Sequence, residues 1–254
     1  MKQILSKMSD IWQKTLNWQP SDRQIEQFDR LYTIILEGNQ TQNLTRITDP
    51  QEFWEKHLWD SLLGVAPFFV PDSTIKLLQE KASLSDPVKI IDIGTGAGFP
   101  GLPITIANPD WSITMVDSTR KKIAFVNNAI ATLQLLNALA IVSRAEALGT
   151  QTAHREQYDL ALIRAVGQPS VCAEYILPFV KVGGFAILYR GHWQESETKD
   201  LKSAVKKLGS EITLIEETAT PLSNSIRNCI YLYKHSPTPS KYPRKIGIPN
   251  QQPL

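Results

Sequence analysis

This chain of 254 residues has two cysteines, no long apolar run and no large excess of positive or negative charge. Cys172 and Cys229 lack metal-ligand spacing and lie in apolar stretches, which predicts reduced, buried thiols in a cytoplasmic protein. No apolar run approaches the roughly 18 residues that a membrane helix needs, and Met1–Ser6 lacks the core of a signal peptide. We therefore expect neither a metal site nor a membrane partner.

Charge is nearly balanced, with a formal net charge of +2. The positive residues gather at Arg120-Lys121-Lys122, at the lysines of 202–207 and in the last 19 residues, which contain three Lys/Arg and no Asp/Glu. A modest basic face of this kind could contact phosphates. On charge alone, ordinary solvated helix faces remain the favoured interpretation.

Three parts can be distinguished along the chain. From Val88 onward strand and helix patterns alternate, which is typical of a parallel sheet with crossover helices. Residues 1–87 have helical patterns and end in a polar boundary stretch. Residues 236–254 are rich in proline and positive charge and have no hydrophobic period, which predicts a tail. We thus expect a helical extension (1–87), an α/β domain (88–235) and a basic, Pro-rich tail (236–254).

Two helices are expected in the extension. One begins near Ser21 or Asp22, either of which can cap it, and ends at Gly38-Asn39. The other covers about 51–65 and places His57 within one turn of Asp60. By spacing alone a structural histidine is the more frequent outcome, and a contact with substrate or cofactor is the alternative.

The α/β domain is expected to contain seven strands and four helices. Two strands at its end have no helix between them, so they should be antiparallel. A dinucleotide-binding domain would usually continue with parallel units, so this ending favours the methyltransferase version of the doubly wound fold. The predicted helices are about 102–107, 120–136, 170–180 and 195–208. The predicted strands are 88–93, 112–117, 139–142, 158–163, 185–189, 211–216 and 226–233.

A glycine-rich turn follows the first strand, in the run Ile-Ile-Asp-Ile-Gly-Thr-Gly-Ala-Gly-Phe-Pro-Gly from Ile90 to Gly101. Its glycines fit both the S-adenosylmethionine turn and the dinucleotide fingerprint. The strand ends at Ile93, so the turn starts at Gly94, as the first interpretation requires. Pro100 also lacks the N–H that a pyrophosphate would use. We therefore expect S-adenosylmethionine, held by the turn residues Asp92, Gly94, Gly96 and Gly98.

Two further strand ends carry acids suited to a nucleoside. Asp117 follows Gly98 by 19 residues and can accept both ribose hydroxyls. It can also cap the next helix together with Ser118-Thr119, an alternative that stays open. After the third strand, the backbone of Ala145 and the carboxylate of Glu146 could recognise adenine. Ligands of open α/β sheets lie over such carboxyl ends.

These motifs together resemble a specific family, the bacterial 16S rRNA guanine-N7 methyltransferases, also called the glucose-inhibited division protein B family. Departures are a short polar insert at 79–87 and Ile163 where many relatives have serine. The matching runs are Asn43-Leu-Thr, His57-Leu-Trp-Asp60-Ser61, Ile91–Pro103, Asp117-Ser118 with Lys121, Ser143-Arg144-Ala145-Glu146, Arg164-Ala165 and Tyr242–Asn250.

The resemblance implies a class I S-adenosylmethionine-dependent methyltransferase fold and 16S rRNA or the small ribosomal subunit as partner. No metal is implied, and we expect a monomer. The residues that would contact RNA are Arg144, Lys121 and His57 with its helix. Those that would line the cofactor pocket are Gly94, Phe99, Asp117, Ser118, Thr119, Ala145, Glu146 and Arg164.

Guanine N7 carries a free lone pair and loses no proton on methylation, so no catalytic base or covalent nucleophile is required. The chain accordingly lacks the Asn-Pro-Pro-Tyr run of amino-group methylation and the Pro-Cys of pyrimidine methylation at the fourth strand. Arg164 occupies that place and is expected to hold the methionine carboxylate or an RNA phosphate. The structural alternative is an ion pair with Asp159 or Glu174.

A small-molecule methyltransferase with the same pocket is the alternative function.

Overall fold

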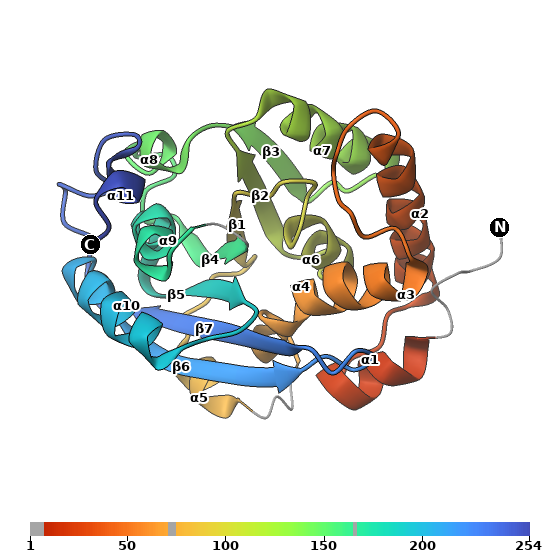
Figure 1. Ribbon diagram of the computed structural model, residues 1–254, viewed down its shortest axis with the longest axis horizontal. Helices are drawn as coiled ribbons and strands as arrows, with labels where there is room; N and C mark the ends of the chain where they lie inside the picture. The colour runs from red at the N-terminus through yellow and green to blue at the C-terminus, as the bar shows by residue number, and fades with distance from the viewer. Residues whose placement is uncertain (1–7, 71–74, 165–166) are drawn as a thin grey trace.

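A seven-stranded sheet forms the centre of the molecule, and helices cover both of its faces (Figure 1). The structure, a computed structural model, describes residues 8–70, 75–164 and 167–254. Ala165, predicted as part of a motif, lies outside these residues. The strands are β1 Lys89–Ile93, β2 Ser112–Asp117, β3 Ala138–Val142, β4 Tyr158–Arg164, β5 Val180–Arg190, β6 Ser210–Ala219 and β7 Ile226–Lys234.

The strand order is β3-β2-β1-β4-β5-β7-β6. β1 to β5 pair in parallel, whereas β7 is antiparallel to both β5 and β6. This order confirms the predicted class I methyltransferase fold, in which a mostly parallel doubly wound sheet ends in an antiparallel unit.

Alternation along the strands creates two cores. Ile90 points to one face and Ile91 and Ile93 point to the other, because successive side chains of a strand lie on opposite faces. The crossover helices cover these faces, with α6 and α7 on one and α8 to α10 on the other. The elements are α5 Lys76–Lys81, α6 Gly101–Ala107, α7 Arg120–Thr132, α8 Ala145–Leu148, α9 Pro169–Ile176, η4 Leu177–Phe179 and α10 Glu195–Lys207.

The predicted start of the fifth strand, residue 185, is wrong, because β5 begins at Val180. Gly183-Gly184, predicted as a connection, lies inside β5. A Cβ on Gly184 would lie 2.4 Å from the carbonyl oxygen of Asp159 on the neighbouring strand. The pairing of β4 and β5 shifts register at this point, so the glycines mark a β-bulge.

The N-terminal helices share the core of the α6–α7 face. Trp12, Phe28 and Trp54 are buried in one cluster with Ile90 and Ile104. Ser21 caps α2 in a reciprocal capping box with Gln24, one of the two predicted caps. The second predicted helix runs continuously from Pro50 to Leu63 with a π-helical centre. The elements are α1 Ser9–Leu16, α2 Asp22–Asn39, α3 Pro50–Phe53, η2 Trp54–Trp59, α4 Asp60–Leu63 and η3 Ala66–Phe68.

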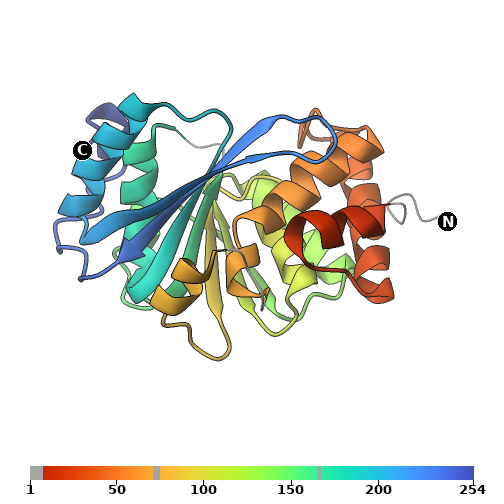
Figure 2. The same ribbon diagram turned by 90° about the horizontal axis from the view of Figure 1, so that it is seen from below.

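Residues 236–254 are packed against the domain instead of forming a free tail. Tyr242 is buried, and a short helix, α11 Ile248–Gln251, lies beside α9. Figure 2 shows this C-terminal segment on the side of the sheet opposite the N-terminal helices. This segment has no hydrophobic period because polar contacts, including those of Arg155 and Arg244, hold it. None of the described helices has the length and apolar character that crossing a bilayer requires.

Candidate functional site

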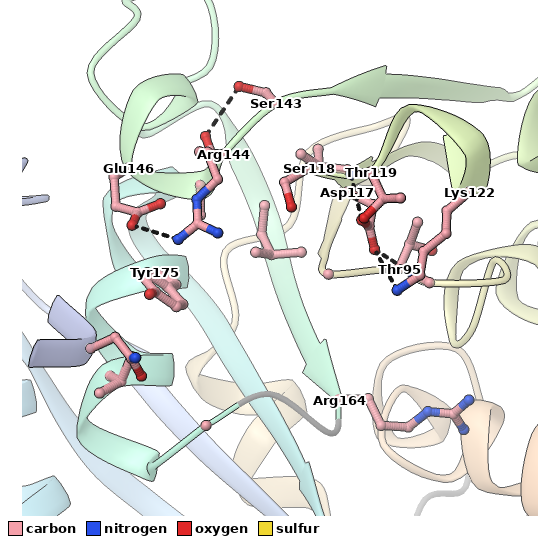
Figure 3. A pocket seen from close by; sticks show the side chains of 18 of the residues that line it. Thr95, Asp117, Ser118, Thr119, Lys122, Ser143, Arg144, Glu146, Arg164 and Tyr175 are labelled. Atoms are coloured by element: carbon pink, nitrogen blue, oxygen red, sulfur yellow. Dashed lines mark hydrogen bonds and ion pairs between the residues drawn. The ribbon is translucent and has the colours of Figure 1, made fainter. Parts of the chain in front are cut away.

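A cavity of about 670 Å³ lies over the carboxyl ends of β1, β2, β3 and β4 (Figure 3). This size falls within the usual range of small-molecule pockets. Its floor is the glycine turn after β1. An N-terminal wall contains Leu44 and His57, with Arg164 beside them, and a C-terminal wall contains Gly247, Asn250 and Gln251.

The glycine turn is shaped by backbone conformations that suit glycine. Gly94, Gly96 and Gly98 have φ values of 74°, 61° and 95°. A Cβ on Gly98 would lie 2.3 Å from Leu102, so this glycine permits the approach of α6. Gly94 and Gly96 line the cavity, whereas Gly98 is not among its lining residues. The predicted contact with a ligand is therefore carried by the first two glycines.

Asp92 lies beneath the turn and is fully buried. Its Oδ2 accepts hydrogen bonds from Thr95 Oγ1 (2.6 Å) and the Gly101 N–H (3.0 Å). Burial raises the pKa of Asp92 to about 6, against the opposing effect of these hydrogen bonds. Asp92 thus braces the turn and does not line the cavity. Since it occupies the first N–H of α6 and Pro100 and Pro103 have none, this helix end offers few donors to a pyrophosphate.

Asp117 at the end of β2 does not cap the next helix, because the N-cap residue of α7 is Thr119, whose side chain forms no cap hydrogen bond. Its Oδ1 accepts from the Thr119 N–H (2.8 Å) and its Oδ2 from the Gly96 N–H (3.1 Å). The carboxylate also lines the cavity, as do Ser118 and Thr119. The cation beside it is Lys122, whose Nζ lies 3.7 Å from Oδ2. Lys121, the predicted lysine, is exposed and is not among the lining residues.

At the opposite side of the cavity, Arg144, Glu146 and Tyr175 lie together (Figure 3). Arg144 Nη2 donates to Glu146 Oε1 (3.1 Å), and the Gly247 N–H donates to the same oxygen (3.0 Å). Burial alone would raise the pKa of Glu146, but the hydrogen bonds from Gly247, from its own N–H and from Arg144 outweigh burial and lower it. Glu146 is therefore ionised at neutral pH. Ala145 lines the cavity next to it, as predicted.

Arg164 is bound by the π-helical segment. Its Nη1 donates to Asp60 Oδ2 (3.0 Å) and to the Lys56 carbonyl oxygen (3.2 Å). The structural alternatives predicted for it are wrong, because Asp159 pairs with Lys181 and Glu174 with Arg244. Arg227 Nε lies 3.1 Å from Asp60 Oδ1, so one carboxylate serves two arginines.

His57 lies between the arginine and the glycine turn. Its ring stacks on Phe99 at 4.3 Å, and its Nε2 lies 2.9 Å from Thr45 Oγ1. Burial, with the charges of Arg164 and Lys56, lowers the pKa of His57 to about 3. The histidine is thus neutral at physiological pH. His57 is packed against Phe99 and also lines the cavity, so a structural role is present and a ligand contact stays a prediction.

Tyr175 is a lining residue that the sequence did not single out, whereas Lys122 and the C-terminal wall were noted only within a basic run and a family motif. Lys122 directly follows the predicted Lys121 on α7. Successive residues of a helix point in different directions, so one of the two can face the cavity while the other does not. The C-terminal wall lies 101 residues from Glu146, and its polar sequence has no hydrophobic period that would have placed it at the cavity. In the described part of the chain, no group of three or more His, Cys, Asp or Glu is placed to hold a metal ion.

Comparison with known proteins identifies the family of this chain. A family model described as rRNA small subunit methyltransferase G matches residues 24–226. The ribosomal RNA small subunit methyltransferases G of Trichormus variabilis and Nostoc punctiforme are each 56% identical to the chain over 100% of both lengths. That of Gloeobacter violaceus is 50% identical over 96% of the chain and 91% of its own length. The chain belongs to this family.

Membership in the small subunit methyltransferase G family confirms the resemblance that the motifs indicated. The family model spans the N-terminal wall, the glycine turn and Arg164. It ends before the C-terminal wall, which the full-length relatives nevertheless cover.

Proposed function

We propose that this protein transfers the methyl group of S-adenosylmethionine to N7 of a guanine in 16S rRNA. The observation that carries the proposal is full-length identity of 56% to a ribosomal RNA small subunit methyltransferase G, in a chain whose cavity lies over the carboxyl strand ends. On this proposal the partner is 16S rRNA or the small subunit, and the protein acts in the cytoplasm as a monomer.

The cavity residues fit S-adenosylmethionine. Gly94 and Gly96 offer a close backbone approach without a phosphate site, Asp117 suits the ribose and Glu146 suits the adenine amine. When bound, S-adenosylmethionine supplies an electrophilic methyl group on its sulfonium. Phe99 and Arg164 then border the methionine end of the cavity.

Positioning is the main task of the remaining residues, because displacement at the methyl carbon needs an in-line approach. Guanine N7 requires no deprotonation, which agrees with a His57 whose pKa of about 3 makes it a poor proton acceptor. A bare cation near a sulfonium would be repelled. The Asp60 carboxylate offsets the charge of Arg164, so Arg164 can orient an anionic group of cofactor or RNA.

Two cations line the cavity, and a third is exposed next to one of them. Arg144 and Lys122 line it, and Lys121 is exposed next to Lys122 on α7. Phosphates of a folded RNA would be attracted to such a rim. We propose that this rim, together with the His57 helix, faces the substrate.

Incubation with radiolabelled S-adenosylmethionine and unmethylated small-subunit RNA or small subunits tests the proposal. Label in RNA, mapped by mass spectrometry to guanine N7, is the expected result. Label on a pyrimidine, or on no RNA, would contradict it. Label in a metabolite with RNA untouched would favour the small-molecule alternative.

A further inference from the structure

The loop that joins α2 to α3 is fixed by the side chain of Asn39, the last residue of α2. Asn39 Oδ1 accepts hydrogen bonds from the N–H groups of Leu44 (3.0 Å) and Thr45 (3.1 Å). Its Nδ2 donates to the Thr45 carbonyl oxygen (2.9 Å). One amide thus uses both of its polar ends to hold two successive residues. The Asn43-Leu-Thr run, one of the family motifs, therefore has a fixed backbone.

Leu44 is brought to the cavity by this loop. It is half-buried and belongs to the lining residues of the N-terminal wall. Its side chain lies against Gly38 of α2, where an added Cβ would be 2.5 Å from Leu44 Cδ1. Both the backbone and the side chain of Leu44 are therefore held before any ligand binds. A side chain fixed in this way loses little conformational entropy when a ligand contacts it.

The N-terminal wall also contains two stacked rings. The ring centroids of His57 and Phe99, which both line the cavity, lie 4.3 Å apart with 12° between the planes. Thr45 Oγ1 lies 2.9 Å from His57 Nε2, so the loop that fixes Leu44 also contacts this ring. With its low pKa, His57 is uncharged at neutral pH. Leu44 and these rings therefore present an uncharged surface to the cavity.

We propose that the base to be methylated lies against Leu44 and that Asn39 is the positioning residue of this contact. Enzymes that modify a base hold it between aromatic or apolar side chains, whereas cations attract phosphates whatever the base. Contact at this wall, beside Phe99, fixes the approach of the base to the methyl group, which is the main task in the transfer. This inference rests on the proposed function, because it takes guanine in RNA as the methyl acceptor.

The kinetic test compares Leu44→Ala with Leu44→Met and Leu36→Ala on unmethylated small-subunit RNA. In Leu44→Ala, kcat should fall at least about 10-fold while KM for RNA changes less than about twofold, because the phosphate contacts remain. Leu44→Met keeps an apolar side chain and should stay within about threefold of the wild-type kcat. Leu36→Ala removes the same atoms from a half-buried leucine of α2 that is not among the lining residues, and it should keep the wild-type kcat.

Isothermal titration with S-adenosylhomocysteine separates a base contact from general damage to the pocket. Its Kd should stay within about twofold of the wild-type value in Leu44→Ala and in Asn39→Ala, whereas Asn39→Ala should lower kcat at least about threefold because the loop loses its anchor. An unchanged kcat in either variant, or a loss of cofactor affinity as large as the loss of kcat, would overturn the inference. If the wild-type protein methylates no small-subunit RNA, the proposed function itself fails.

Photo-cross-linking gives a readout that does not depend on turnover. RNA with 6-thioguanosine at the position that the wild-type protein methylates is irradiated with the protein and S-adenosylhomocysteine. Mass spectrometry of the cross-linked peptide should identify Leu44 or His57. A cross-link found only at 247–251 would place the base at the C-terminal wall, and the assignment of Leu44 would be wrong.

Discussion

The two walls of the pocket come from opposite ends of the chain and are stabilised by different interactions. In the N-terminal wall, His57 is packed among aromatic rings, with Phe99 at 4.3 Å and Phe53 at 5.3 Å. In the C-terminal wall, Gly247 is held through backbone hydrogen bonds and the Glu174–Arg244 ion pair. One wall is thus continuous with the hydrophobic core. The other is held mainly by polar contacts, although Tyr242 of the same segment is buried in the second core.

This difference predicts separable effects of substitution. A change beneath the N-terminal wall removes buried apolar contacts and should reduce the stability of the whole protein. A change in the exposed residues of the C-terminal wall should alter ligand binding while leaving the free energy of unfolding nearly constant. Three substitutions can break or sharpen this contrast.

The largest effect is expected for Phe53→Ala. Phe53 is fully buried and contacts the rings of Tyr32, His57 and Phe99. Loss of the ring should lower the free energy of unfolding by about 3–5 kcal/mol, because the site cannot collapse fully around the cavity. Urea denaturation followed by circular dichroism measures this change. The matched variant is Asn250→Ala in the C-terminal wall, where the change should stay within about 0.5 kcal/mol. Equal destabilisation by both would contradict the contrast.

Arg164→Ala should have the next largest effect, on methyl transfer. Arg164 lines the cavity, and loss of its side chain should lower kcat/KM about 100-fold through misplaced reactants. Arg227→Ala is the matched control, because it removes the other arginine bound to Asp60 without touching the cavity lining. Arg227→Ala should cost similar stability and less than about tenfold in kcat/KM. Comparable losses of activity in both variants would assign Arg164 a purely structural role.

The contrast between the walls also explains which features the sequence predicted. Hydrophobic period, strand-end acids and the glycine run identified the sheet and placed Gly94, Asp117 and Glu146 at one cavity, because these signals are local. Local signals could not show that Asp60, 104 residues before Arg164, would be its partner.

The same limit applies to the C-terminal wall. Arg244 and Gly247 reach carboxylates on α9 and α8 through polar contacts, which leave no periodic pattern in the sequence. Asp92 was assigned to the ligand because it adjoins the glycines, yet its side chain points beneath the turn, where Thr95 and Gly101 bind it.

The smallest effect, and the finest test of the N-terminal wall, is the pH dependence introduced by His57. Its pKa is about 3 in the folded protein and near 6.5 when unfolded, so the unfolded state binds more protons between these values. Stability should therefore fall as the pH decreases through this window, by about 2 kcal/mol between pH 7 and pH 5. Asp92, with its raised pKa, acts in the opposite direction over part of the same range.

The effect of His57 is consequently isolated as a difference between the wild-type protein and His57→Phe, a variant that keeps a ring against Phe99 and retains Asp92. Urea denaturation at pH 7 and pH 5 should show the stability advantage of the wild type over the variant shrinking by about 2 kcal/mol on acidification. A difference that stays constant with pH would mean that His57 is protonated as readily in the folded as in the unfolded chain. The N-terminal wall would then be open to water, and its contrast with the polar C-terminal wall would disappear.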